Sequence, residues 1–189
     1  MDGAFDPFGG FDWNSAGSAV IQGYSNLTAV GQMSGPVTNT FYANAVQLQN
    51  TGGGNFATPN LFPTNGAGTY EYTTVAQFTE ILTCVAVSAG TCVSLNANII
   101  GGSFDIYYGT GAARDSNLVS LTGLTNGTPL ISGTINPGFA GNTTVVGTGF
   151  PGPGSGLIGI SLFSGAVTST NSTFINPALV GTTATATVQ

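Results

Sequence analysis

Carboxylates are the only groups in this chain that conventional acid–base or covalent catalysis could use. The sequence has no histidine, so it holds no Ser-His-Asp or Cys-His unit. Glu71 and Glu80 share one extended run, and their nine-residue separation at ~3.3 Å per residue places them about 30 Å apart. A glycosidase pair needs about 5–10 Å. We therefore predict no catalytic residues, and expect the carboxylates, including Asp105 and Asp115, to be solvated or paired with Arg114.

Metal and cofactor sites are not expected either. Asp2, Asp6 and Asp12 offer oxygens to a calcium ion, but their spacing matches no calcium loop. Two cysteines are too few for a structural zinc site, which needs four ligands. The glycine-rich stretches at 51–54 (TGGG) and 101–102 lack the Lys-Ser/Thr pair and the strand-to-helix context of a phosphate loop, so they are predicted to be turns.

Charge is scarce throughout the sequence. One Lys+Arg against seven Asp+Glu gives a net charge of −6, and 4% of residues are charged where soluble domains carry about 25%. A single cation cannot neutralise several phosphates, so nucleic acid is excluded as a partner, and anionic lipid is repelled. No run of 18 apolar residues and no signal peptide occur in the chain as given. We expect a mature sequence from which targeting segments have been removed.

Alternation of side chains predicts an all-β fold. From Thr69 to Glu80, Tyr70, Tyr72, Ala76 and Phe78 share one parity and polar residues share the other, as in a half-buried strand. Similar short runs recur between Gly, Asn and Pro, at 18–22, 39–48, 81–87, 91–97, 103–108, 129–135, 143–147, 157–164 and 182–188. About ten short strands favour a single β-sandwich or jelly-roll-like domain over residues 18–189, preceded by a Gly-rich aromatic arm at 1–17.

The two cysteines are predicted to form a disulfide across a hairpin. Cys84 and Cys92 flank a Ser-Ala-Gly turn, and if they lie opposite one another the loop has three or five residues, with Gly90 supplying a left-handed conformation. The bond would contribute about 2–3 kcal/mol. The alternative is two buried thiols in a reducing compartment.

Four Asn-X-Ser/Thr sequons occur, at Asn26, Asn126, Asn142 and Asn171. They indicate exposed loops only where the host glycosylates secreted proteins. In a chain this rich in Asn and Thr, chance matches are the competing explanation.

The composition also favours self-association. Sheet edges usually avoid other chains through Lys, inward-pointing charge or Pro, and this chain has no Lys. Two terminal segments are candidates for strand exchange between copies. They are the arm with Phe5, Phe8, Phe11 and Trp13, and the closing strand with Thr183, Thr185 and Thr187. The alternative is that both termini fold onto their own domain.

Three segments together resemble bacterial PEP-CTERM surface proteins, and most of all their flocculation-associated members. They are Gly68–Glu80 (GTYEYTTVAQFTE), Ser103–Tyr108 (SFDIYY) and Asn117–Ile135 (NLVSLTGLTNGTPLISGTI), and Phe11-Asp12-Trp13 resembles the family's N-terminal portion. The resemblance covers about residues 11 to 136 and implies export from a Gram-negative cell, sorting by an exosortase and a role in matrix or floc formation. The family's Pro-Glu-Pro signal, apolar helix and basic tail do not follow Gln189 in the sequence given, and we expect either that they were cleaved or that this is a relative that never had them.

These observations predict a secreted, non-enzymatic structural protein that assembles with itself into an extracellular filament or matrix. The expected partner is the chain itself, with exopolysaccharide as a further partner. The alternative function is a surface module that binds carbohydrate or ice through Trp13, Tyr107, Tyr108 or the alternating threonines.

Overall fold

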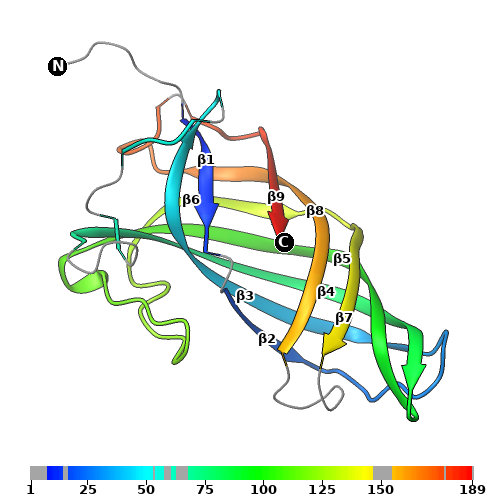
Figure 1. Cartoon of the computed structure of the whole chain (residues 1–189). Helices are drawn as coiled ribbons and strands as arrows, with labels where there is room; N and C mark the ends of the chain where they lie inside the picture. Colours follow the sequence, from blue (N-terminus) through cyan, green and yellow to red (C-terminus); the bar gives the residue numbers. More distant parts are fainter. Residues whose placement is uncertain are drawn as a thin grey trace. The chain divides into compact units, whose positions relative to one another are not determined.

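The computed structural model describes residues 8–14, 17–52, 54–57, 61–62, 68–146, 155–176 and 178–188. Strand accounts for 64% of the chain, and no α-helix occurs among the described residues. The elements are β1 (Phe8–Trp13), β2 (Ser18–Gln22), β3 (Met33–Asn50), β4 (Tyr70–Ser88), β5 (Thr91–Thr110), the 3₁₀ turn η1 (Gly111–Ala113), β6 (Thr128–Ile135), β7 (Gly138–Val146), β8 (Ser155–Thr170) and β9 (Thr183–Val188) (Figure 1). The all-β prediction is confirmed.

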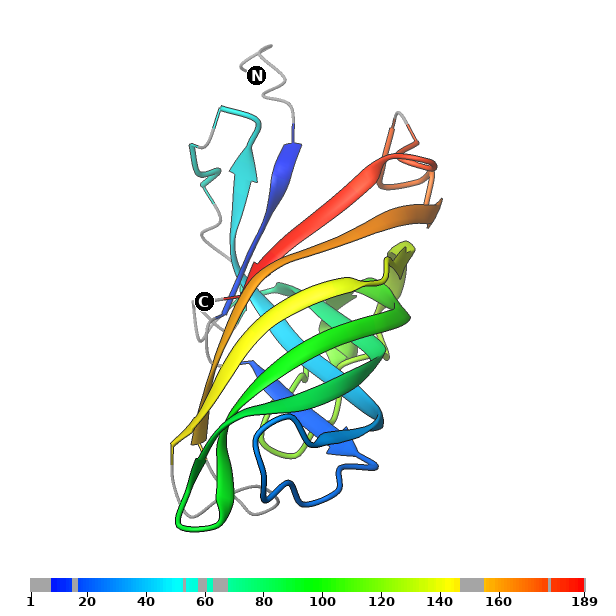
Figure 2. The same ribbon diagram turned by 90° about the vertical axis from the view of Figure 1, so that its right-hand side faces the viewer.

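The strands follow one another across a single hydrogen-bonded sheet. The order is β1-β3-β4-β5-β6-β8-β7, while β2 pairs with β3, β9 pairs with β8, and β5 also pairs with β7. Both β6 and β7 therefore lie between β5 and β8. They follow one another along the same row of the sheet, separated by Asn136 and Pro137. Figure 2 shows β7, β8 and β9 side by side in yellow, orange and red.

The strands are fewer and longer than predicted. The runs expected at 69–80 and 81–87 form one strand, β4, and those at 91–97 and 103–108 form β5. The turn predicted at 101–102 is wrong, because both glycines lie within β5. A Cβ at Gly102 would overlap the main chain of Gln77 and Phe78, so this glycine permits close approach of β4 and β5. The two packed sheets of a sandwich are not confirmed.

The described residues form two compact units. Unit 1 takes its residues from 1–18, 41–75 and 106–130, and unit 2 from 19–40, 76–105 and 131–189. Strands β3, β4, β5 and β6 contribute to both, and β2 belongs to unit 2 from its second residue, Ala19, onward. The buried core of unit 1 includes Ala43, Ala45, Leu61 and Leu124, and that of unit 2 includes Leu82, Leu95, Ile99, Ile131 and Ile135.

The predicted disulfide is present in unit 2. Cys84 and Cys92 are joined, and each is 1% exposed. The predicted loop of three or five residues is wrong, because a two-residue turn joins β4 to β5. Ala89 and Gly90 both have positive φ, the conformation that two-residue hairpins of type I′ require.

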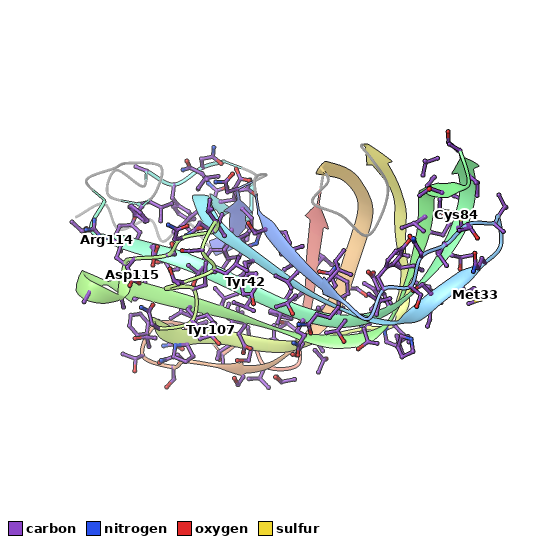
Figure 3. All side chains as sticks on the ribbon, turned by 90° about the horizontal axis from the view of Figure 1, so that it is seen from below. Met33, Tyr42, Cys84, Tyr107, Arg114 and Asp115 are labelled. Carbon is purple, nitrogen blue, oxygen red and sulfur yellow. A yellow bond between two sulfur atoms is a disulfide. The ribbon has the colours of Figure 1, made fainter. Side chains whose placement is uncertain are left out.

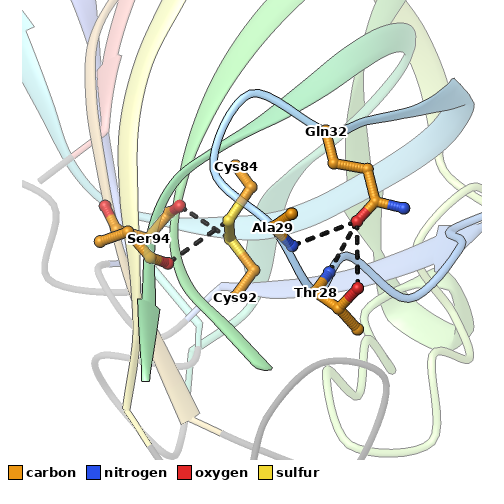
Figure 4. Close-up of a disulfide and its surroundings, with 7 residues drawn as sticks. Thr28, Ala29, Gln32, Cys84, Cys92 and Ser94 are labelled. Atoms are coloured by element: carbon orange, nitrogen blue, oxygen red, sulfur yellow. Dashed lines mark hydrogen bonds between the residues drawn. A yellow bond between two sulfur atoms is a disulfide. The ribbon is translucent and has the colours of Figure 1, made fainter. Parts of the chain in front are cut away.

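The segment between β2 and β3 covers the disulfide. The Cys84 N–H donates to the Gln32 carbonyl at 2.9 Å, and the Cys92 N–H donates to the Leu27 carbonyl at 2.9 Å. The Gln32 side-chain oxygen accepts from the N–H groups of Thr28 and Ala29 at 2.7 and 3.2 Å, which closes the turn (Figure 4). The disulfide strands therefore hold the connection that follows β2.

The Phe104 ring occupies space that glycines leave open in unit 2. A Cβ at Gly133 in β6 would overlap this ring and the carbonyl oxygen of Ala166 in β8. Gly165 in β8 is also close to the ring, at 3.5 Å from the position that its Cβ would take. The contact packs β5 across β6 and β8, the strand against which β9 pairs.

We predict that Gly133→Ala lowers the free energy of unfolding by about 1–3 kcal/mol, because neither the ring nor the main chain can move aside without strain. Gly138→Ala is the matched control, since a Cβ there meets nothing within 4 Å. Urea denaturation followed by circular dichroism measures both. Equal unfolding midpoints for the two variants would contradict the packing account.

Candidate functional site

Five half-buried aromatic side chains form a cluster in unit 1, here called the aromatic cluster: Phe11, Trp13, Tyr70, Tyr72 and Tyr108. The rings of Phe11 and Trp13 are stacked, with centroids 5.0 Å apart and planes 23° apart. The ring centroid of Tyr72 lies 5.2 Å from that of Phe11, 5.8 Å from that of Tyr70 and 5.3 Å from that of Tyr108. The last three contacts are tilted or edge-on, so the rings pack against one another instead of forming one flat platform.

Strand pairing brings these residues together. Phe11 lies opposite Leu48 and Trp13 opposite Ala45 in the antiparallel pair of β1 with β3. Because Phe11 and Trp13 are two residues apart on β1, strand alternation places both rings on one face. Tyr70 and Tyr72 alternate along β4 with the period of two that the sequence indicated.

The phenol groups of Tyr70 and Tyr72 remain uncharged. Burial, together with the neighbouring Tyr108 and Tyr70 hydroxyls, raises the pKa of Tyr72 to about 12. Burial and Tyr108 also raise the pKa of Tyr70. Neutral rings and phenol groups suit stacking and hydrogen bonding with a neutral ligand.

Glu71 points away from the aromatic cluster and is 1% exposed. Its carboxylate accepts hydrogen bonds from the Ser116 hydroxyl and, at 3.4 Å, from the Ser116 N–H. The Asn44 side chain donates to the same hydroxyl. Burial raises the pKa of Glu71, against the lowering effect of the Ser116 hydrogen bonds. A second hydrogen bond joins β4 to the loop after β5, because the Thr73 hydroxyl donates to the Leu124 carbonyl at 2.7 Å.

Glu80 is buried in unit 2, at 5% exposed. Burial raises its pKa, and a hydrogen bond from the Asn39 side chain opposes the rise. The expectation of solvated carboxylates is therefore wrong for both glutamates. Neither carboxylate reaches the surface, where a substrate would bind.

Arg114 contacts an aromatic ring where an ion pair with a carboxylate was the expectation. Its guanidinium carbon lies 5.5 Å from the centroid of Phe62, and its buried Nε has no hydrogen-bond partner in the described part of the chain. Asp115, its neighbour in Figure 3, accepts a 2.8 Å hydrogen bond from the Asn126 side chain. The contact with Phe62 is a cation–π interaction.

Two of the predicted assembly residues pack on their own chain. Phe11 and Trp13 contact each other, and Phe11 contacts Tyr72 of β4. Phe8 begins β1, opposite Asn50, and Phe5 lies outside the described residues. Tyr107 precedes Tyr108 in β5, so strand alternation directs it to the opposite face.

The alternating threonines lie in unit 2, on β9. Thr183 and Thr185 are exposed, and Thr187 is in the same strand, which pairs with β8. Glu80 and Asp105 are the two charged residues that the sequence gives unit 2, and none occurs after Asp115. Met33 and Cys84, close together in Figure 3, belong to the same unit. Unit 2 thus holds little charge, and one of its two carboxylates is buried.

Three of the four sequon asparagines lie outside the strands. Asn26 and Asn126 are exposed, and the Asn171 side chain accepts from the Thr173 N–H at 3.1 Å. Asn142 lies within β7, opposite Asn96 on one side and Gly159 on the other. Asn26, Asn126 and Asn171 therefore have the loop positions expected of acceptor sites, and Asn142 does not.

No group of three or more His, Cys, Asp or Glu that could hold a metal ion occurs among the described residues. The same residues contain no helix with the length and apolar character needed to cross a membrane. The disulfide is compatible with an extracellular location. Comparison of the chain with protein-family models, curated proteins and solved structures found no match.

We predict that the protein becomes more stable as the pH falls from 7 towards 4.5. Burial raises the pKa values of Glu71 and Glu80, so the folded state binds their protons more tightly than the unfolded state does. This contribution is complete below the ordinary value of 4.5 and is lost as the pH rises through the raised values. Melting temperatures across this range measure it.

The double variant E71Q/E80Q is expected to lose most of this pH dependence. Asp12→Asn, which removes an exposed carboxylate from β1, is the control and should keep it. A wild-type melting temperature that falls on acidification, or an unchanged slope in the double variant, would count against the burial account.

Proposed function

We propose that the chain is a secreted, non-enzymatic structural protein that self-associates into an extracellular filament or matrix, as a biofilm or floc component outside a Gram-negative cell. The observation that carries the proposal is the pair of uncharged edge strands of unit 2, β2 and β9. Edges with neither charge nor proline lack the protection that those residues give against pairing with another chain.

The surface chemistry supports the same proposal. Unit 2 contains two charged residues, so copies approach one another through this unit with little electrostatic repulsion. The buried disulfide supplies stability in an oxidising environment. Catalysis is not proposed, because Glu71 and Glu80 are both enclosed.

A second candidate function, binding of exopolysaccharide, is favoured by the aromatic cluster. Neutral rings stack on the apolar faces of sugars, and the Tyr70 and Tyr72 hydroxyls remain protonated donors. The tilt between most rings favours a single glycan chain over a flat crystalline surface. Pull-down on insoluble polysaccharide tests this function, with Trp13→Ala expected to weaken retention and Val119→Ala, at a 96% exposed site, to leave it unchanged.

We predict that the purified wild-type chain forms polymers as its concentration rises. Sedimentation velocity should show species larger than the 18.9 kDa monomer, and negative-stain microscopy should show filaments or sheets. Polymers should persist at high salt, because main-chain pairing does not depend on charge. A chain that stays monomeric at every concentration while binding polysaccharide would overturn the proposal in favour of the second candidate.

A further inference from the structure

Unit 2 has two edge strands. Among the described strands, β2 pairs with β3 alone, and β9 pairs with β8 alone. Each therefore has one side of its backbone without a strand partner in the described part of the chain. The two edges lie on different strands at opposite ends of the pairing order.

The two edges match in length and chemistry. Strand β2 has five residues (SAVIQ) and β9 has six (TATATV), and neither contains a charge or a proline. Ala19 and Gln22 of β2 and Thr183 and Thr185 of β9 are exposed. Small or uncharged side chains at these positions leave room for another strand to approach the backbone.

The edge of unit 1 differs. Strand β1 carries the exposed carboxylate of Asp12, and its Phe11 and Trp13 rings are engaged in the aromatic cluster. A charge on an edge strand opposes pairing with another chain. The candidate edges therefore reduce to the two in unit 2.

Both unit 2 edges are held in place by neighbouring structure. The connection after β2 is bonded to the disulfide strands through Leu27 and Gln32. Strand β9 is set by its register with β8, with Thr183 opposite Ala166 and Thr185 opposite Ser164. An edge that is already extended loses little backbone freedom when it pairs.

We infer that β2 of one copy pairs with β9 of the next, so that the sheets of successive copies join head to tail. This inference rests on the proposed self-association and names its interface and its partner, a second copy of this chain. Pairing between two different edges leaves one β2 and one β9 free at the ends of every oligomer. Such a heterologous interface continues into an open polymer when the rotation between copies does not close a ring.

Variants that block one edge each test the inference. Ala19→Lys with Gln22→Lys blocks β2, and Thr183→Lys with Thr185→Lys blocks β9. The control, Thr125→Lys with Ser172→Lys, adds the same charge at exposed positions outside the strands. Circular dichroism and intact mass establish that each variant keeps its strands and its disulfide.

By sedimentation velocity, the wild-type chain and the control are expected to polymerise. Each blocked variant alone is expected to stay mainly monomeric, with a polymer fraction at least tenfold lower than that of the wild type. An equimolar mixture of the two blocked variants should give dimers, because one free β9 meets one free β2. Dimers of the β2-blocked variant alone would indicate β9–β9 pairing and would overturn the inference, as would a mixture that remains monomeric.

A second variant keeps the test decisive if the lysine variants unfold. With Gln22→Cys and Thr185→Cys in one chain, oxidation of the polymer should give a ladder of covalent oligomers on a non-reducing gel, and Thr125→Cys with Thr185→Cys should not. No ladder from a wild-type-like polymer would refute the β2–β9 interface and leave self-association standing. A wild-type chain that never polymerises would refute the proposed function itself.

Discussion

Main-chain hydrogen bonding at the sheet edges is the constraint on which the account of this protein depends. Every strand needs partners for its N–H and C=O groups, and long strands such as β3, β4 and β5 find them on both sides. Among the described strands, β2 pairs with β3 alone and β9 with β8 alone. Because these two edges carry no charge, nothing in their side chains prevents another copy from completing the pattern.

The few charges of the chain are placed so that they leave this surface neutral. Glu71 and Glu80 are enclosed, with hydrogen bonds from Ser116 and Asn39 that partly offset the cost of burial. Arg114 contacts the Phe62 ring. Asp12 and Asp115 are exposed, but both belong to unit 1. The surface of β2 and β9 carries hydroxyl, amide and apolar groups, which interact with neutral partners at any ionic strength.

The sequence predicted the features that depend on residues close together in the chain. The period of two identified Tyr70 and Tyr72 on one face, the bounds of β2 were predicted as observed, and the disulfide followed from the spacing of its cysteines. The glycines of the 101–102 pair were mistaken for a turn, because close strand approach and chain reversal favour the same residue.

Contacts between distant parts of the chain could not be predicted. The buried Glu71 accepts a hydrogen bond from Ser116, 45 residues away, and no local signal marks such a pair. The aromatic cluster likewise depends on the pairing of β1 with β3. The importance of β2 as an edge was missed, although a short strand without charge or proline was a usable signal.

Amide hydrogen exchange of the assembled protein, compared with the dilute monomer, tests the central claim most directly, since it reports on main-chain hydrogen bonds themselves. The account predicts that assembly increases protection mainly at Ser18–Gln22 and Thr183–Val188, with little change at Phe8–Trp13. Increased protection at Phe8–Trp13, with β2 and β9 unchanged, would contradict it.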